Sequence, residues 1–207
     1  INEGKVRGLR FPVQVVIRDH ATDYRGYAGR LTSGSVTVGD TVSVGGADGR
    51  TTTVVGIDGP GGPQERAERG ESVTLRLADD IDISRGDLLA EATDGDEVPP
   101  LSNQVTALVF QLAETPVRVR GNVQLRYGTS LVRGRVDEIV RRVDIIGGEN
   151  DERGDDPTLQ LNDIAEVRIT VAEPLPFEPY RRGGRVGSFL LIQPGSGDTL
   201  TAGLVQD

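Results

Sequence analysis

The chain has 207 residues, with 32 Asp and Glu against 23 Lys and Arg, so its formal net charge is −9. It has no cysteine and one histidine, which excludes disulfides, thiolate metal sites, a cysteine nucleophile and any zinc site built on two imidazoles. The acidic balance argues against nucleic acid as a partner of the whole chain, with a local basic patch as the alternative. No apolar run approaches the ~18 residues of a membrane-spanning helix.

Short runs of alternating β-branched and polar residues, separated by Gly and Pro, predict β-strands along the whole chain. The segments 73–77 and 167–171 have the clearest alternation. One segment, 64–71, could instead form a single helical turn that Gly70 ends. We expect an all-β chain with strands at 12–18, 26–33, 36–38, 42–44, 52–57, 73–77, 104–113, 117–126, 130–139, 159–161, 167–171 and 188–193.

One break in this pattern divides the chain. Residues 93–100 are acidic and then Pro-rich, and a Pro-Pro pair removes two backbone donors, so it does not fit a central strand. We therefore expect two antiparallel β-barrels in tandem rather than one larger barrel. The predicted divisions are a linker at 1–8, a first barrel at 9–93, a linker at 94–101 and a second barrel at 102–207.

The common motifs for nucleotide binding and nucleophilic catalysis are missing. The sequence has no GxxxxGK[ST], no GxGxxG and no GxSxG. We therefore assign no catalytic, cofactor-binding or metal-binding residue in this chain. It also contains no Met, and its first residues are polar, so we expect it to be a piece of a longer protein.

Two carboxylate clusters are candidates for cation binding. Asp79, Asp80 and Asp82 follow a predicted strand, and we interpret them as a solvated turn in which Asp87 pairs with Arg85; an ion site is the alternative. The second cluster, in 147–157, lacks the spacing of a calcium-binding loop. We expect that segment to be an exposed, metal-free surface loop.

A few residues carry other candidate chemistry. His20 lies in a polar turn with no second base nearby in the sequence, which favours a loop role over catalysis. The segments Tyr24–Tyr27 and Tyr180–Arg182 interleave aromatic residues with Arg, as a small nucleic-acid patch does. The more common arrangement is that such rings pack at barrel ends with their hydroxyl groups in water.

The segment 25–44 has a more specific pattern, R-G-x-x-G-x-x-x-S-G-x-V-x-x-G-D-x-V-x-V. Gly26 and Gly29 allow a close approach of strands, Ser33 and Gly34 make a turn, and Gly39-Asp40 turns the chain again. This pattern resembles the second, β-barrel domain of translational GTPases of the elongation factor Tu superfamily.

Further segments narrow the resemblance. They look like the large, GTP-binding subunit of bacterial sulfate adenylyltransferase, and the resemblance runs from about residue 9 to residue 205. Where relatives often have a histidine-containing stretch, this chain has Tyr127-Gly128-Thr129. The matching segments are 10–14, 23–29, 72–77, 80–87, 161–164, 173–180, 187–192 and 202–203.

The resemblance implies a function for the parent protein. Such an enzyme is cytoplasmic, serves sulfate assimilation and cysteine biosynthesis, and joins sulfate to ATP to give adenylylsulfate and pyrophosphate, coupled to GTP hydrolysis. GTP and Mg would lie in a GTPase domain outside this chain, and a small subunit would transfer the adenylyl group. The barrels would then bind these two partners. The alternative is the barrel pair of a translation elongation factor that holds tRNA or the ribosome, which the charge of −9 disfavours.

Overall fold

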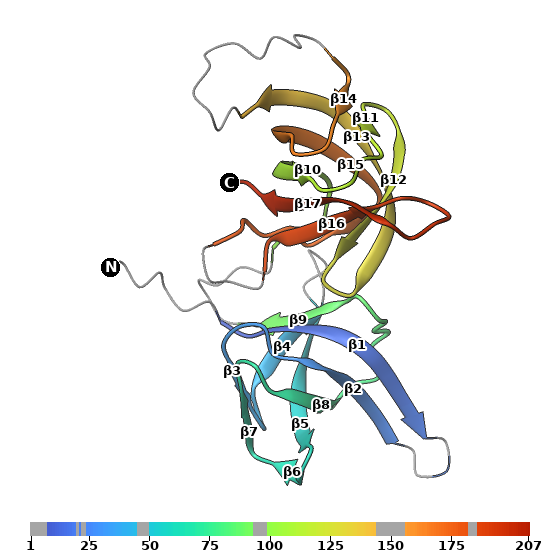
Figure 1. Ribbon diagram of the computed structural model, residues 1–207. Coiled ribbons are helices and arrows are strands. Elements are labelled where there is room, and N and C mark those ends of the chain that lie inside the picture. Colours follow the sequence, from blue (N-terminus) through green and yellow to red (C-terminus); the bar gives the residue numbers. More distant parts are fainter. Residues whose placement is uncertain are drawn as a thin grey trace. The chain divides into compact units, whose positions relative to one another are not determined.

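A computed structural model of the chain describes residues 8–19, 21, 24–44, 50–92, 99–143, 156–181 and 186–207. The described residues form seventeen β-strands and no helix, which confirms the all-β prediction (Figure 1). The chain divides into two compact units, Ile1–Leu101 and Ser102–Asp207.

The first unit is an antiparallel sheet that closes on itself. Its strand order is β4-β9-β1-β2-β8-β5-β6, and a further pairing of β4 with β5 joins the ends of this order, so six strands form a ring. The short pair β3 and β7 forms a separate ladder. The strands are β1 (Arg10–Asp19), β2 (Tyr24–Arg30), β3 (Ser35–Thr37), β4 (Thr41–Val44), β5 (Thr51–Gly59), β6 (Gly62–Gln64), β7 (Arg66–Glu68), β8 (Ser72–Leu77) and β9 (Leu88–Glu91).

Alternation along the strands builds the core of this barrel. In β8 the side chains of Val73 and Leu75 point inward, beside the fully buried Phe11 of β1. Gly29 lets β1 and β2 approach, because a Cβ there would overlap the Pro12 carbonyl oxygen. Gly39 has a φ of 99°, a backbone conformation that favours glycine, so the predicted turn at Gly39-Asp40 is confirmed.

The second unit is a closed barrel with the strand order β10-β15-β13-β12-β16-β17. The two short strands β11 and β14 pair with each other outside the barrel. With the fold of the first unit, this confirms two antiparallel β-barrels in tandem. The strands are β10 (Ser102–Gln111), β11 (Val117–Arg118), β12 (Asn122–Tyr127), β13 (Ser130–Arg142), β14 (Thr158–Leu159), β15 (Ile164–Leu175), β16 (Ser188–Ile192) and β17 (Thr199–Val205).

Some predicted elements differ from those in the structure. The segment 64–71 contains β7 rather than a helical turn, because Val36 and Ala67 pair across β3 and β7 and both are fully buried. The predicted strand 117–126 is interrupted at Arg120, whose φ of 63° turns the chain between β11 and β12. The strands β6, β9 and β17 were not predicted.

Candidate functional site

One polar cluster of the first barrel joins three neighbouring strands. The hydroxyl group of Tyr24 (β2) donates a hydrogen bond of 2.8 Å to Asp58 Oδ2 (β5), and Arg76 (β8) pairs with the same oxygen at 3.3 Å. Two glycines make room for these side chains. A Cβ at Gly26 would crowd the Tyr24 hydroxyl, and one at Gly56 would overlap the Arg76 guanidinium. The cluster therefore joins β2, β8 and β5, and the two glycines leave the space that its side chains occupy.

The environment of Tyr24 favours its neutral form. Burial raises the pKa of Tyr24 above the ordinary 10.0, and the hydrogen bond to Asp58 and the negative charge of that carboxylate raise it further. Arg76 acts in the opposite direction and lowers this pKa. The hydroxyl is therefore held as a hydrogen-bond donor.

A second cluster fastens the loop that follows β8. Arg25 pairs with Asp80, donates from Nη2 to the Ile81 carbonyl oxygen at 2.8 Å, and lies 5.4 Å from the centre of the Tyr27 ring. The Tyr27 hydroxyl also donates to the Ile81 oxygen, at 3.3 Å. Burial is the main reason that the pKa of Tyr27 is raised.

These contacts decide between the interpretations of the segment Tyr24–Tyr27. The Tyr27 ring is packed in the barrel, as expected, since only 1% of the residue is exposed. The expectation of a hydroxyl group in water was wrong for Tyr27, whose residue is almost fully buried. Tyr24 is half-buried, and its hydroxyl group also bonds to Asp58. The guanidinium of Arg25 binds Asp80 and the Ile81 carbonyl oxygen, so it is not available to bind a phosphate group.

The carboxylates after β8 form a loop with local hydrogen bonds. Asp87 Oδ2 accepts a hydrogen bond of 2.7 Å from the Ser84 backbone N–H. The predicted pair of Asp87 with Arg85 is wrong: among the described residues no ion pair joins these two side chains, and the Asp87 carboxylate bonds to the Ser84 backbone instead. In the part of the chain that the structure describes, no group of three or more His, Cys, Asp or Glu residues is arranged to hold a metal ion.

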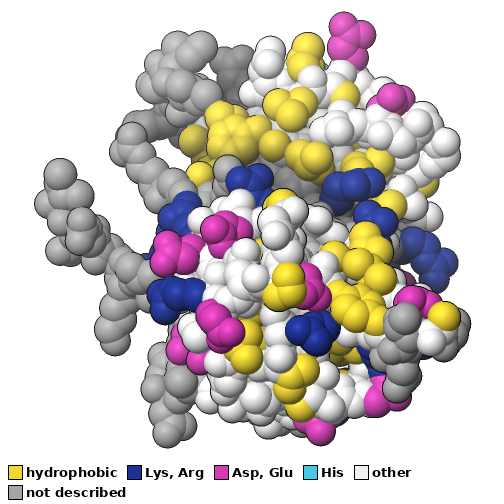
Figure 2. All heavy atoms as spheres, turned by 90° about the horizontal axis from the view of Figure 1, so that it is seen from below, with side chains coloured by type: hydrophobic (Ala, Val, Ile, Leu, Met, Phe, Trp, Pro, Cys, Tyr) yellow, Lys and Arg dark blue, Asp and Glu magenta, His cyan; other side chains and the backbone are white. Residues whose placement is uncertain are grey.

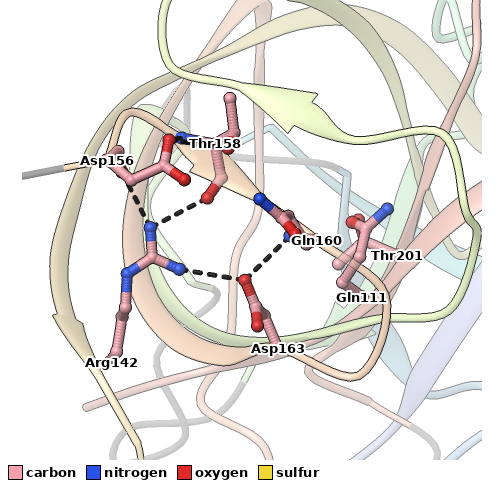
Figure 3. A network of polar contacts seen from close by, with 7 residues as sticks. All are labelled: Gln111, Arg142, Asp156, Thr158, Gln160, Asp163 and Thr201. Carbon is pink, nitrogen blue, oxygen red and sulfur yellow. Dashed lines mark hydrogen bonds and ion pairs between the residues drawn. The ribbon is translucent and has the colours of Figure 1, made fainter. Parts of the chain in front are cut away.

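The most extensive polar network lies in the second unit (Figure 3). Arg142, at the end of β13, pairs with Asp163 at 2.9 Å, and both side chains are more than nine-tenths buried. The Nη2 atom of Arg142 also donates to the carbonyl oxygens of Asp156 and Thr158, at 2.7 and 2.8 Å. The same Asp163 oxygen accepts the Gln160 backbone N–H at 2.8 Å.

Gln111 extends this network into the barrel. Its backbone N–H bonds to the Asp163 carbonyl oxygen at 2.9 Å, and its side-chain oxygen accepts the Thr201 hydroxyl at 2.9 Å. Its amide nitrogen donates to the carbonyl oxygens of Ala113 and Thr115. The network therefore links β10, β13, β14 and β17 with the turn at Asp163 that precedes β15, and it holds the chain on both sides of residues 144–155.

Part of the predicted loop 147–157 is fixed by this network. Asp156 is only half-buried, but its carboxylate accepts hydrogen bonds from the backbone N–H and the hydroxyl of Thr158. The Pro157 carbonyl oxygen accepts the Val119 N–H at 2.7 Å. At this end of the predicted loop Pro157 is exposed, as expected, whereas Asp156 is half-buried and fixed by hydrogen bonds. Residues 147–155, like His20, lie outside the described residues.

Tyr127, the first residue of the segment Tyr127-Gly128-Thr129, has packing and hydrogen-bonding contacts. Its ring meets the Phe177 ring edge to face at 5.2 Å. Its hydroxyl accepts the Glu178 backbone N–H at 3.1 Å. From the second Tyr-Arg segment, the Tyr180 backbone N–H bonds to the Val205 oxygen at 2.9 Å, and Arg182 lies outside the described residues.

Comparisons with known proteins agree with this architecture. Residues 104–206 match the family model described as "GTP-eEF1A C-terminal domain-like". Two solved structures of sup35, one with GDP and one with GMPPNP, align with TM-scores of 0.78 and 0.82. They are 16% and 17% identical in sequence, and the alignments cover 96% and 99% of this chain and 47% and 48% of theirs. The fold is therefore the barrel pair of translation-factor-type proteins.

Sequence relatives identify a narrower group within that class. The chain is 37% identical to the bifunctional enzyme CysN/CysC of Mycobacterium tuberculosis, over 95% of this chain and 32% of the relative. It is 35% identical to sulfate adenylyltransferase subunit 1 of Bacteroides thetaiotaomicron, over 100% of this chain and 43% of the relative. The corresponding protein of Methylorubrum extorquens is 36% identical over 99% and 42%.

The resemblance to the large subunit of sulfate adenylyltransferase is thereby confirmed. Along nearly its whole length the chain is similar to part of sulfate adenylyltransferase subunit 1, and it spans between 32% and 43% of these relatives. The name "subunit 1" describes proteins of a multisubunit enzyme. None of the described residues forms a helix that could cross a membrane.

Proposed function

We propose that this chain is the barrel region of a sulfate adenylyltransferase large subunit and supports GTP-coupled synthesis of adenylylsulfate from ATP and sulfate. In this proposal the barrels position a GTPase domain and a small, adenylyl-transferring subunit in a cytoplasmic enzyme. GTP and Mg bind in the GTPase domain, outside these 207 residues. The chain itself contributes binding and geometry rather than catalytic residues.

The main support for this proposal is the sequence similarity to sulfate adenylyltransferase subunit 1. The identity to sulfate adenylyltransferase subunit 1 extends over nearly the whole chain, at 35–37%, yet the chain corresponds to less than half of those relatives. The motifs that cradle nucleotide phosphates are missing from it. A phosphate-binding site of the parent enzyme therefore belongs to the rest of the protein.

The two polar clusters and the Arg142 network support a positioning role. They tie strands and loops of each barrel together, so each barrel can act as one body. A body with no reaction of its own can influence a reaction only by binding the states of a partner with different affinity. Movement of such bodies about flexible connections is a common way to transmit the state of a nucleotide site.

The test removes the second barrel, residues 102–207, from the longer protein. We expect the remaining protein to bind GTP as before, while more GTP is hydrolysed for each adenylylsulfate formed, because the link to the small subunit is weakened. The measurement is this ratio together with the affinity for the small subunit. A shortened control should lack only residues 147–154. An unchanged ratio with unchanged affinity would contradict the coupling role.

A role as barrels of a translation factor has weaker support. The similarity to sup35, at 16–17% identity, supports a shared fold and not a shared function. A filter-binding measurement with tRNA, beside a pull-down with the small subunit, separates the two functions.

A further inference from the structure

One stretch of the second barrel reverses the charge of the chain. The segment 115–136 contains five arginines and no Asp or Glu, a formal charge of +5, which leaves −14 on the other 185 residues. Figure 2 shows one face of the molecule, on which basic and acidic side chains lie mixed. A concentration of one sign within 22 residues of an acidic chain needs an explanation.

The fold places these arginines on one outer surface. In β12 and β13, Val123, Leu125 and Val132 point into the barrel, so the alternate residues point outward. Arg126 pairs with Leu131 across the strands, and Gln124 pairs with Arg133. Arg126 and Arg133 are therefore diagonal neighbours on the outer face, with about 7–8 Å between their Cα atoms.

The remaining arginines continue this surface. Arg135 lies opposite Asn122, two register positions beyond Arg133 and therefore on the same face. The Arg120 backbone N–H bonds to the Val136 oxygen at 2.7 Å, and the Arg118 oxygen accepts the Gly121 N–H, which brings the β11–β12 turn beside the same end of β13. We call this surface the arginine strip: Arg118, Arg120, Arg126, Arg133 and Arg135.

Among the residues that the structure describes, the guanidinium groups of the strip have few partners. All five residues are exposed. Arg135 pairs with Asp137 at 2.8 Å, and the other four side chains make no hydrogen bond or ion pair with any described residue. Like charges this close repel one another, so the strip costs stability unless an opposite charge covers it.

The surroundings favour a compact partner over a long polyanion. Outside the segment 115–136, the second unit has 15 acidic residues and 7 arginines, a formal charge of −8. A nucleic acid makes many phosphate contacts along an extended path and would meet this acidic surface beyond the strip. Tyr127, the aromatic residue of the segment, packs on Phe177 instead of presenting its face to a base.

We propose that the arginine strip is the docking surface for an acidic face of a second protein subunit, the small subunit of the enzyme. This deepens the proposed function and rests on it. Arginine is well suited to such a surface, since its planar fork can bind carboxylates with two hydrogen bonds. The charge pattern also confines docking to one orientation, because the rest of the chain repels an acidic partner.

The experiment measures the affinity of the 207-residue chain for the small subunit from the same genome. The variant combines Arg126→Glu with Arg133→Glu. Its matched control combines Arg50→Glu with Arg85→Glu, two exposed first-barrel residues without ion pairs to described residues. Both variants change the net charge equally. The melting temperature of each shows whether it is folded.

We expect Kd to rise at least about tenfold in the strip variant and less than about twofold in the control. The affinity of the unmodified chain should also fall steeply between about 50 and 300 mM NaCl. Equal affinities of the folded variants would overturn the docking surface and leave the proposed function standing. No binding by the unmodified chain would overturn both. Binding of tRNA that depends on the strip, without binding of the small subunit, would identify a nucleic-acid surface instead.

Discussion

Tyr24 and Tyr27 lie three positions apart, and each uses its hydroxyl group to fasten a different part of the first barrel. The Tyr24 hydroxyl reaches Asp58 on another strand, and the Tyr27 hydroxyl reaches the Ile81 carbonyl oxygen in the loop after β8. In both cases the phenol acts as a donor, which it can do only while it is protonated.

This requirement makes stability sensitive to alkaline pH. The pKa of Tyr24 is raised in the folded state, so the unfolded chain loses this proton first and stability falls as the pH rises above about 10. We expect Tyr24→Phe to reduce this alkaline loss, although it gives up one hydrogen bond at neutral pH. Urea unfolding at about pH 8 and pH 11 measures the effect. Tyr180→Phe is the control, and an equal alkaline loss in Tyr24→Phe and the unmodified chain would contradict the prediction.

The loss of Arg142 should destabilise the second barrel. Replacing it with Met removes the ion pair to the buried Asp163 and the hydrogen bonds to the carbonyl oxygens of Asp156 and Thr158. We expect a loss of about 3–5 kcal/mol in the free energy of unfolding. Arg141→Met, on the same strand, removes an exposed pair with Glu166 and should cost about 0–1 kcal/mol.

A second substitution tests the assignment of this loss. Adding Asp163→Asn to Arg142→Met removes the uncompensated charge, so the double variant should be more stable than the sum of the two single losses implies. Strict additivity would show that the ion pair is not the source of the effect.

At the scale of strands, Gly29 allows a close approach of β1 and β2 in the first barrel. We expect Gly29→Ala to cost about 1–3 kcal/mol, because the added Cβ overlaps the Pro12 carbonyl oxygen and meets the Phe11 ring. Gly61→Ala is a matched control, since a Cβ there has nothing within 4 Å. Thermal unfolding of both variants compares them, and similar melting temperatures would refute the steric argument.

Strands with regular alternation could be predicted from sequence, and others could not. The segment 72–77 alternates inward and outward residues, so its pattern indicates a strand directly. The strand β9, Leu88–Glu91, is short and nearly all buried, which removes the alternation. In β17, Gly203 resembles a turn residue in sequence, yet it is there because the Phe189 ring occupies the space of a side chain.

The polar clusters were predicted less completely for a related reason. The sequence indicates Tyr24 and Arg25 as candidates. Their partners Asp58 and Ile81 lie 34 and 56 residues away, and only the folding of the sheet brings them into contact. Arg142 and Asp163 were not singled out, since isolated charged residues are usually exposed. The pairing that buries them depends on the fold of the second barrel.

At the scale of the whole molecule, each unit has its own hydrophobic core and its own closed set of strands. We expect the chain by itself not to bind GTP or ATP at physiological concentrations, because a phosphate loop, its lysine and the hydroxyl that binds magnesium are missing from the sequence. Calorimetry with each nucleotide and Mg²⁺ measures this directly. A micromolar dissociation constant would show that the barrels contain a nucleotide site of another kind.

Because of the Arg142 network, the second barrel should accept an inserted sequence between β13 and β14. One guanidinium holds the carbonyl oxygens of Asp156 and Thr158 while its own residue ends β13, so the two attachment points of the intervening segment are fastened to each other. Because lengthening a loop between fixed ends adds little closure entropy, a fluorescent reporter or an affinity tag inserted at 147–154 should leave the barrel intact. Such a label would report on the second unit of the chain.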